Sequence, residues 1–258
     1  MSDKAIPERY NTVTPYLTAR RAAEMVDFVK AAFGAEEMLR VPMPAGGLHA
    51  EVRLGDSMLM MGGGETLTQT PMPTALHLYV PDADAAYQRA LDLGATKTYE
   101  PTDQPYGDHE AGVKDPFGNQ WYIATHLGNS FLPEGLRTMM AYLHPNDAPG
   151  LIQFLKQAFG GQEEARYADP GGAIAHARLR IGDSVVEMSE ARGEYQPMPT
   201  MFYLRVDHCD AVYQRALQAG AKSIETPADQ PYGDRRAAVE DGWGNLWYMA
   251  TPIKKEGS

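Results

Sequence analysis

Two histidines and a glutamate occur at spacings that could bind a metal ion. His49 and Glu51 are separated by one residue in "LHAEVRL", and His77 lies in "ALHLYV". In a β-strand, residues two apart point to the same face, and two histidines with one carboxylate form a known type of iron site. The alternative is that His49 and Glu51 only make hydrogen bonds at the rim of a hairpin.

Arginines in the second half of the chain are candidates for binding an anion. They are Arg178, Arg180, Arg205 and Arg236. Guanidinium groups bind carboxylates through two parallel hydrogen bonds, so these side chains could recognise an acidic ligand. The alternative is that they pair with Glu187 and other acids of neighbouring strands. Glu187 is itself the candidate for acid–base catalysis.

Tyrosines on predicted strands could form the walls of sites that bind flat or cationic ligands. They are Tyr16, Tyr79, Tyr122, Tyr142, Tyr203 and Tyr248. Trp121 and Trp247 each precede one of these tyrosines, so they point to the opposite face and are predicted to lie in the core. Glu110 and His176 complete the predicted set of ligand-binding residues.

The chain contains one sequence pattern twice. The hexapeptide "DQPYGD" at 103–108 returns 126 residues later at 229–234, and "FGNQWYIAT" is answered by "WGNLWYMAT". The offset becomes 127 around "GDS", which indicates one inserted residue in the second copy. We therefore predict a first domain at 1–127, a linker at 128–136 and a second domain at 137–258.

The two copies differ in charge at matched positions of the predicted binding faces. The differing pairs are Glu51 and Arg178, Tyr79 and Arg205, Glu110 and Arg236, and Met60 and Glu187. Most of these differences make the second copy more basic. The sequence thus predicts two unequal binding sites, of which the second favours an aromatic ligand that carries a carboxylate.

The hydrophobic pattern of each copy predicts a strand, a helix and three strands, twice over. Residues 23–33 carry apolar side chains at helical spacing and end at Gly34, a residue that favours a helix C-terminus. In the stretch "HAEVRLGDSMLMMGG", side chains alternate between the two faces of a strand on both sides of a "GD" turn, as in a β-hairpin. This order predicts an α+β fold of four βαβββ modules. One face of each curved mixed sheet packs against helices, and the other face is available to a ligand.

Several stretches resemble the vicinal-oxygen-chelate superfamily, which includes glyoxalase I, bleomycin-resistance proteins and extradiol dioxygenases. They are "AAEMVDFVKAAFGAEE", "HLYVPDADAAYQRALDLGA" and "DPFGNQWYIATH". The PhnB-like branch is the most similar one, and the resemblance covers nearly the whole chain. It implies that pairs of modules curl around a cup, and that this chain is a fused pseudo-dimer with two cups.

Metal-dependent members of that superfamily carry His and Glu ligands on the first, fourth, fifth and eighth strands of paired modules. The matching positions here are Thr14, Met60, Ala75, Tyr122, Met140, Glu187, Met201 and Tyr248. Only Glu187 among them is a strong ligand for a hard divalent metal. We therefore expect no metal and no other cofactor, with His49, Glu51 and His77 as the alternative metal site.

A net charge of −11 and a hydrophobic content of 43% describe an acidic, folded chain. Its acidity disfavours nucleic acid and anionic membranes as partners, because the one basic tract, "IKKEGS", is short. No apolar run approaches the roughly 18 residues of a membrane span. With a single cysteine, Cys209, and no apolar N-terminal signal, we expect a cytoplasmic protein whose partner is a small molecule.

These observations favour metal-free binding or sequestration of a small, partly aromatic molecule in one or both cups. Glyoxalase and dioxygenase chemistry use a metal to polarise or bind oxygen, and the side chains at the superfamily's ligand positions do not suit one. The alternative function is an enzyme of the same superfamily, a lyase, an isomerase or a dioxygenase. It would use a metal near His49 or acid–base groups such as Glu187.

Overall fold

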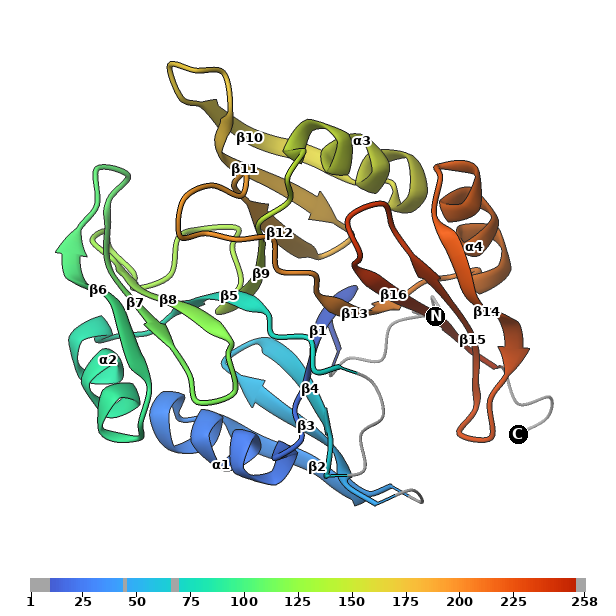
Figure 1. The fold of residues 1–258 in the computed structure, drawn as a ribbon, viewed down its shortest axis with the longest axis horizontal. Helices are drawn as coiled ribbons and strands as arrows, with labels where there is room; N and C mark the ends of the chain where they lie inside the picture. Colours follow the sequence, from blue (N-terminus) through green and yellow to red (C-terminus); the bar gives the residue numbers. More distant parts are fainter. Residues whose placement is uncertain (1–9, 44–45, 66–69, 254–258) are drawn as a thin grey trace. The chain divides into compact units, whose positions relative to one another are not determined.

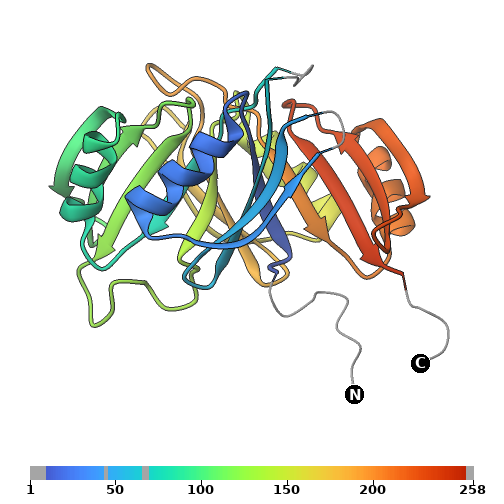
Figure 2. The same ribbon diagram turned by 90° about the horizontal axis from the view of Figure 1, so that it is seen from below.

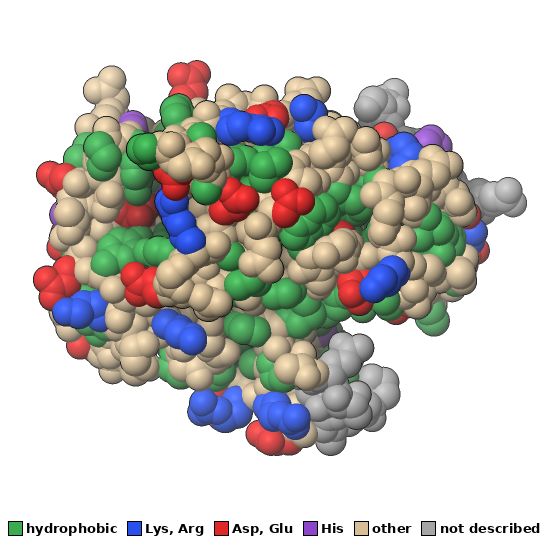
Figure 3. Space-filling view, turned by 45° about the horizontal axis from the view of Figure 1, so that its top comes forward, with side chains coloured by type: hydrophobic (Ala, Val, Ile, Leu, Met, Phe, Trp, Pro, Cys, Tyr) green, Lys and Arg blue, Asp and Glu red, His purple; other side chains and the backbone are tan. Residues whose placement is uncertain are grey.

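The computed structural model describes residues 10–43, 46–65 and 70–253. The first nine residues and all but Ile253 of the basic tract "IKKEGS" lie outside these ranges. No helix within them is long and apolar enough to cross a membrane. On the face drawn in Figure 3, Lys and Arg side chains are dispersed among Asp and Glu and do not form one basic patch.

Four βαβββ modules follow one another along the chain (Figure 1). Module 1 consists of β1 (Val13–Thr18), α1 (Ala22–Phe33), β2 (Glu36–Pro42), β3 (Leu48–Leu54) and β4 (Ser57–Gly63). Module 2 consists of β5 (Ala75–Tyr79), α2 (Ala83–Asp92), β6 (Thr96–Asp103), β7 (Asp108–Lys114) and β8 (Gln120–His126). Module 3 consists of β9 (Met139–Leu143), α3 (Ala148–Phe159), β10 (Gln162–Ala168), β11 (Ile174–Ile181) and β12 (Ser184–Met188). Module 4 consists of β13 (Met201–Arg205), α4 (Cys209–Gln218), β14 (Lys222–Asp229), β15 (Asp234–Glu240) and β16 (Leu246–Pro252), so the predicted α+β fold of four modules is confirmed.

The strands of a module combine one parallel pair with antiparallel pairs. In module 2 the hydrogen-bonded order is β5-β8-β7-β6, with β5 parallel to β8. Module 4 repeats this order as β13-β16-β15-β14, and module 1 as β1-β4-β3-β2. Helix α2 covers one face of β6, β7 and β8 (Figures 1 and 2), so their other face carries the polar side chains discussed below.

The chain divides into two compact units that nearly follow the sequence repeat. One unit is Pro15–Tyr142, and the other combines residues up to Thr14 with those from Leu143 onward. The unit boundaries therefore cut through strands β1 and β9, which open the first and the second copy. The segment 127–138 between the copies contains no helix or strand.

The first residues of each copy are held by the other copy's unit. Strand β9 pairs antiparallel with β5, with Tyr142 opposite Ala75, and the Met139 N–H donates to Ser57 Oγ at 3.0 Å. In the other unit, the Val13 N–H donates to Ser184 Oγ at 2.9 Å. Ser57 and Ser184 belong to the two "GDS" turns of the repeat. The turns that match in sequence thus make the same hydrogen bond.

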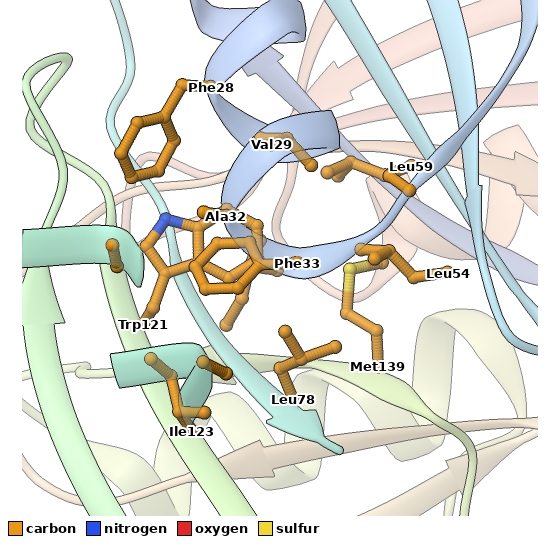
Figure 4. Close-up of a cluster of buried hydrophobic side chains, with 14 of the residues drawn as sticks. Phe28, Val29, Ala32, Phe33, Leu54, Leu59, Leu78, Trp121, Ile123 and Met139 are labelled. Carbon is orange, nitrogen blue, oxygen red and sulfur yellow. The ribbon is translucent and has the colours of Figure 1, made fainter. Parts of the chain in front are cut away.

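A core of apolar side chains lies between the helices and the strands of modules 1 and 2 (Figure 4). Helix α1 contributes Phe28, Val29, Ala32 and Phe33, and it ends at Gly34, whose φ of 72° allows its N–H to reach the Lys30 carbonyl. The Phe33 ring lies 4.5 Å from the indole of Trp121. Trp121 and its mate Trp247 are fully buried, as the strand parity predicts.

A buried aspartate fixes the turn before each of these tryptophans. Asp115 accepts hydrogen bonds from the Phe117 and Asn119 N–H groups, the Asn119 side chain and the indole N–H of Trp121. Asp241 makes the equivalent bonds in the second copy. Burial raises the pKa of both carboxyl groups despite these hydrogen bonds. This turn sets the register of β8 and β16, on which Tyr122 and Tyr248 lie.

Candidate functional site

The polar face of module 2 is the side of its strands that lies opposite α2. It carries ionisable and aromatic side chains of the first copy. Strand pairing arranges them in rows across the strands: Tyr99, Gly112, Tyr122 and His77 in one row, and Glu110, Ala124 and Tyr79 in the next. The residues that alternate with them, such as Trp121 and Leu78, belong to the core. Strand alternation therefore places the apolar side chains on one face of the strands and the polar side chains on the opposite face.

Glu110 is the centre of this face and is only 7% exposed. Its Oε1 accepts hydrogen bonds from the hydroxyls of Tyr99 at 2.5 Å and Tyr106 at 3.2 Å. Its Oε2 lies 3.4 Å from Nε2 of His77. Burial and the nearby carboxylate raise the pKa of Tyr99 far above the ordinary value, and the Glu110 carboxylate also raises the pKa of Tyr106, so both hydroxyls stay protonated donors.

Gly112 makes room for the Tyr99 ring. A Cβ at position 112 would lie 2.3 Å from a ring carbon of Tyr99, closer than any real contact. The ring can therefore cross β7 and bring its hydroxyl to Glu110. The second copy has Ala238 at the matched position, where Glu225 replaces Tyr99.

Aromatic rings form a wall beside Glu110. The Tyr122 ring stacks with that of Tyr99 at 6.4 Å and meets that of Tyr142 edge-on at 4.9 Å. His77 lies against Tyr79 at 4.6 Å. Such rings offer flat surfaces to an aromatic or cationic ligand.

A second carboxylate lies two residues from Glu110 on the same strand face. Asp108 is 4% exposed and accepts a hydrogen bond from the Tyr79 hydroxyl at 2.8 Å. Its other oxygen lies 2.7 Å from Nδ1 of His126. The contacts made by Asp108 and Glu110 within the described ranges include tyrosines and histidines but neither Lys nor Arg.

The second copy builds the equivalent face with arginine. Arg236, the mate of Glu110, donates to Glu225 at 2.7 Å and to the Tyr232 hydroxyl at 3.0 Å. Its guanidinium lies 5.3 Å from the ring centre of Tyr248. Arg236 is thus placed between a carboxylate and an aromatic ring.

Arg205, the mate of Tyr79, forms the second ion pair of this face. It donates to Asp234 at 2.8 Å, and the Tyr203 hydroxyl donates to the same oxygen at 3.0 Å. The rings of Tyr10 and Tyr203 lie 5.1 and 5.0 Å from its guanidinium. The alternative interpretation of these arginines, in which they pair with neighbouring acids, therefore describes Arg205 and Arg236.

The repeated hexapeptide serves both faces through its tyrosine. Tyr106 donates to Glu110, whereas Tyr232 accepts from Arg236, four residues after it in each case. A phenol can donate or accept, so one loop sequence suits a carboxylate in one copy and a guanidinium in the other. Both tyrosines are exposed residues, at 60% and 59%.

The polar face of module 1 carries a separate hydrogen-bonded chain. The Tyr16 hydroxyl lies 2.9 Å from Nδ1 of His49, and Nε2 of His49 lies 3.5 Å from Glu51, which is 4% exposed. A Cβ at Gly62 would lie 2.3 Å from the Tyr16 hydroxyl, so the glycine permits this approach.

Module 3 keeps the His–carboxylate pair but moves the carboxylate to the next strand. His176 lies 3.8 Å from Glu187 of β12, which faces Arg178 of β11, just as Met60 faces Glu51 in module 1. Arg178 and Arg180 approach Glu164 of β10 instead, at 3.8 and 2.5 Å.

The alternative metal set of His49, Glu51 and His77 does not come together in the described part of the chain. His77 on β5 lies 3.4 Å from Glu110 on β7, whereas His49 lies 3.5 Å from Glu51 on β3. No group of three or more His, Cys, Asp or Glu with metal-binding geometry occurs in the described part of the chain. Arg178 and Arg180 share Glu164, whereas Arg205 pairs with Asp234 and Arg236 with Glu225.

Sequence reasoning missed Tyr99, Tyr106, Asp108, Glu225 and Asp234. A signal existed for Tyr106, because the hexapeptide that contains it is identical in both copies. Tyr99 lies beside register shifts in the β6–β7 pairing, where strand parity cannot be read from the sequence.

The chain matches the model of the "Glyoxalase/Bleomycin resistance protein/Dioxygenase superfamily" at residues 9–123 and again at 140–249. The uncharacterized proteins Mb0911c of Mycobacterium bovis and Rv0887c of Mycobacterium tuberculosis are each 42% identical over 122 residues. These matches cover 43% of this chain, and 80% and 72% of the two relatives.

Solved structures share the fold at low sequence identity. Glyoxalase I from Zea mays superimposes with a TM-score of 0.71 at 14% identity, covering 93% of this chain and 92% of that one. A putative dioxygenase from Bacillus subtilis reaches a TM-score of 0.61 at 14% identity, covering 95% and 86% of the two chains.

Proposed function

Because this chain belongs to the glyoxalase/bleomycin resistance protein/dioxygenase superfamily, we propose that it binds and sequesters a small, partly aromatic molecule without a resident metal. The site is the polar face of module 2. The observation that carries the proposal is that the hydroxyls of Tyr99 and Tyr106 donate to the buried carboxylate of Glu110, with the Tyr122 ring stacked on that of Tyr99.

The side chains at the superfamily's ligand positions support binding over metal chemistry. Thr14, Met60, Ala75 and Tyr122 in the first copy offer a hydroxyl, a thioether, a methyl and a phenol. None of these is a strong ligand for a hard divalent metal, and all four are buried. The residues present do not fit the metal centre.

Calorimetric titration of flat aromatic compounds tests the proposal. We expect binding that persists after EDTA treatment and weakens at least tenfold in Tyr122→Ala, because that change removes the ring beside Glu110. The matched control is Tyr248→Ala in the second copy, which should leave this binding within about twofold. Loss of binding on chelation, with recovery on adding one divalent metal, would overturn the metal-free function.

Acid–base catalysis is the second candidate, and the paired His and carboxylate groups favour it. His49 with Glu51 and His176 with Glu187 occur at matched places although the carboxylate has changed strand. Turnover of a bound compound that survives EDTA and is lost in His49→Gln or Glu187→Gln would establish an enzyme.

The proposal includes a cytoplasmic location and a fused pseudo-dimer with small molecules as partners. Cys209, the single cysteine, is buried, and burial raises the pKa of its thiol to about 11. A thiol in this state is unreactive and suits a reducing compartment.

A further inference from the structure

The two copies differ in how they neutralise the carboxylates of their polar faces. In the second copy, Asp234 and Glu225 each receive an arginine, at 2.8 and 2.7 Å. In the first copy, Asp108 and Glu110 are 4% and 7% exposed, yet their contacts in the described ranges include only tyrosines and histidines. The polar face of the first copy therefore carries two buried carboxylates but lacks the guanidinium groups that neutralise the carboxylates of the second copy.

A buried carboxylate without a cation is costly, because hydrogen bonds from neutral donors do not cancel its charge. The histidine nearest Glu110 is His77, and the distance of 3.4 Å exceeds the roughly 2.7–2.9 Å of a charge-assisted hydrogen bond. A cation that reached Glu110 would therefore be bound more strongly here than at an exposed carboxylate.

The second copy also indicates the shape of the missing cation. Arg236 presents a flat guanidinium that contacts Glu225, the Tyr232 hydroxyl and, at 5.3 Å, the ring of Tyr248. In the first copy, Tyr106 and Tyr122 occupy the places of Tyr232 and Tyr248. The phenol and the ring of this arrangement are present, while Glu110 stands where the second copy has Arg236 and Tyr99 stands where it has Glu225.

We infer that the polar face of module 2 binds a planar cation, an amidinium or guanidinium group carried on a small flat frame. This inference rests on the proposed function and names its ligand class. The ligand's cationic group hydrogen-bonds to Glu110 and lies against Tyr122, as Arg236 lies against Tyr248. Tyr106 is 60% exposed and its bond to Glu110 is the longer of the two tyrosine bonds, so its side chain gives way to the ligand.

The experiment uses three probes of nearly equal shape: benzamidine, benzamide and benzoate. Each is titrated calorimetrically into the full chain, Glu110→Gln and Tyr232→Phe, the last being the second-copy mate of the loop tyrosine. We expect one benzamidine per chain, bound at least tenfold more tightly than benzamide, and no binding of benzoate. Glu110→Gln should weaken benzamidine at least tenfold and benzamide less than twofold, while Tyr232→Phe changes neither.

A second variant introduces a cationic side chain of the protein itself in place of the ligand's cation. Tyr99→Arg places a guanidinium where the Tyr99 hydroxyl donates to Glu110 at 2.5 Å, and it should abolish benzamidine binding. Thermal unfolding followed by circular dichroism shows whether this variant folds, and Glu110→Gln decides the matter if it does not.

The outcomes separate the two proposals. Binding of benzamide or benzoate at least as tight as that of benzamidine overturns the cation while leaving the aromatic site intact, and so does unchanged benzamidine binding in Glu110→Gln. If none of the three probes binds, both the cation and the proposed function fail.

Discussion

At the scale of single residues, the Tyr99 hydroxyl and Glu110 form the shortest of the hydrogen bonds to this carboxylate, at 2.5 Å. Removing the hydroxyl in Tyr99→Phe leaves a buried carboxylate with one donor fewer. We expect the free energy of unfolding to fall by about 1.5–3 kcal/mol, the range for hydrogen bonds to charged groups. Urea unfolding measures it, and Tyr106→Phe is the control, because its ring is exposed and its loss should be smaller. Equal and negligible losses would show that Glu110 does not depend on these hydroxyls.

His144 predicts how stability depends on pH. Burial lowers its pKa to about 4, whereas an ordinary histidine titrates near 6.5. As the pH falls below 6.5, the unfolded chain takes up this proton before the folded one does, so stability decreases until the pH reaches about 4. The loss should amount to about 3 kcal/mol and be missing in His144→Gln, whose mate in the first copy is Thr18. Denaturant titrations between pH 7 and 4 measure it, and parallel curves for both proteins would refute it.

Strand alternation is why His77, Glu110, Tyr122 and other members of the site could be predicted from the sequence. Their positions follow from parity along strands with regular pairing. The partner of each charge could not be predicted, because Glu225 reaches Arg236 from the neighbouring strand β14, whereas Asp234 on β15 reaches Arg205 on β13 across β16. The pairing of residues across strands depends on register, which the register shifts in β6–β7 and β14–β15 alter.

At the scale of elements, Gly112 on β7 allows the Tyr99 side chain of the neighbouring strand β6 to cross β7. In Gly112→Ala the new Cβ would lie 2.3 Å from the Tyr99 ring, so the ring must swing away from Glu110. We expect a loss of about 1–3 kcal/mol in stability, typical of overpacking, and weaker binding of benzamidine. The matched Ala238→Gly should leave that binding unchanged. Unaltered binding and stability in Gly112→Ala would show that the Tyr99 ring is not held there.

The order of helices and strands could be predicted because hydrophobic periodicity and turn residues agree in both copies. The exchange of β1 and β9 between the compact units could not be predicted. The sequence patterns of segments 10–14 and 139–142 resemble those of strands that stay within one unit. Their places are decided by hydrogen bonds to the distant turns at Ser57 and Ser184.

At the scale of the whole molecule, this exchange predicts how the chain can be divided. A fragment of residues 1–128 lacks β9, so the edge of β5 that pairs with it is exposed. We expect this fragment to self-associate or aggregate, because unpaired strand edges recruit other chains. A fragment of residues 1–143 keeps β9 and should be more soluble under the same conditions. Analytical ultracentrifugation compares them, and a stable monomer for residues 1–128 would contradict the exchange.

The most direct test of the proposed function is to map the bound ligand on EDTA-treated protein by nuclear magnetic resonance. Benzamidine is added to the labelled full chain, and amide shifts are followed residue by residue. We predict that the perturbed amides cluster in β5–β8 and the loop at 103–108, with β13–β16 unaffected. Perturbations confined to other segments, or none in the absence of metal, would contradict a metal-free site on the polar face of module 2.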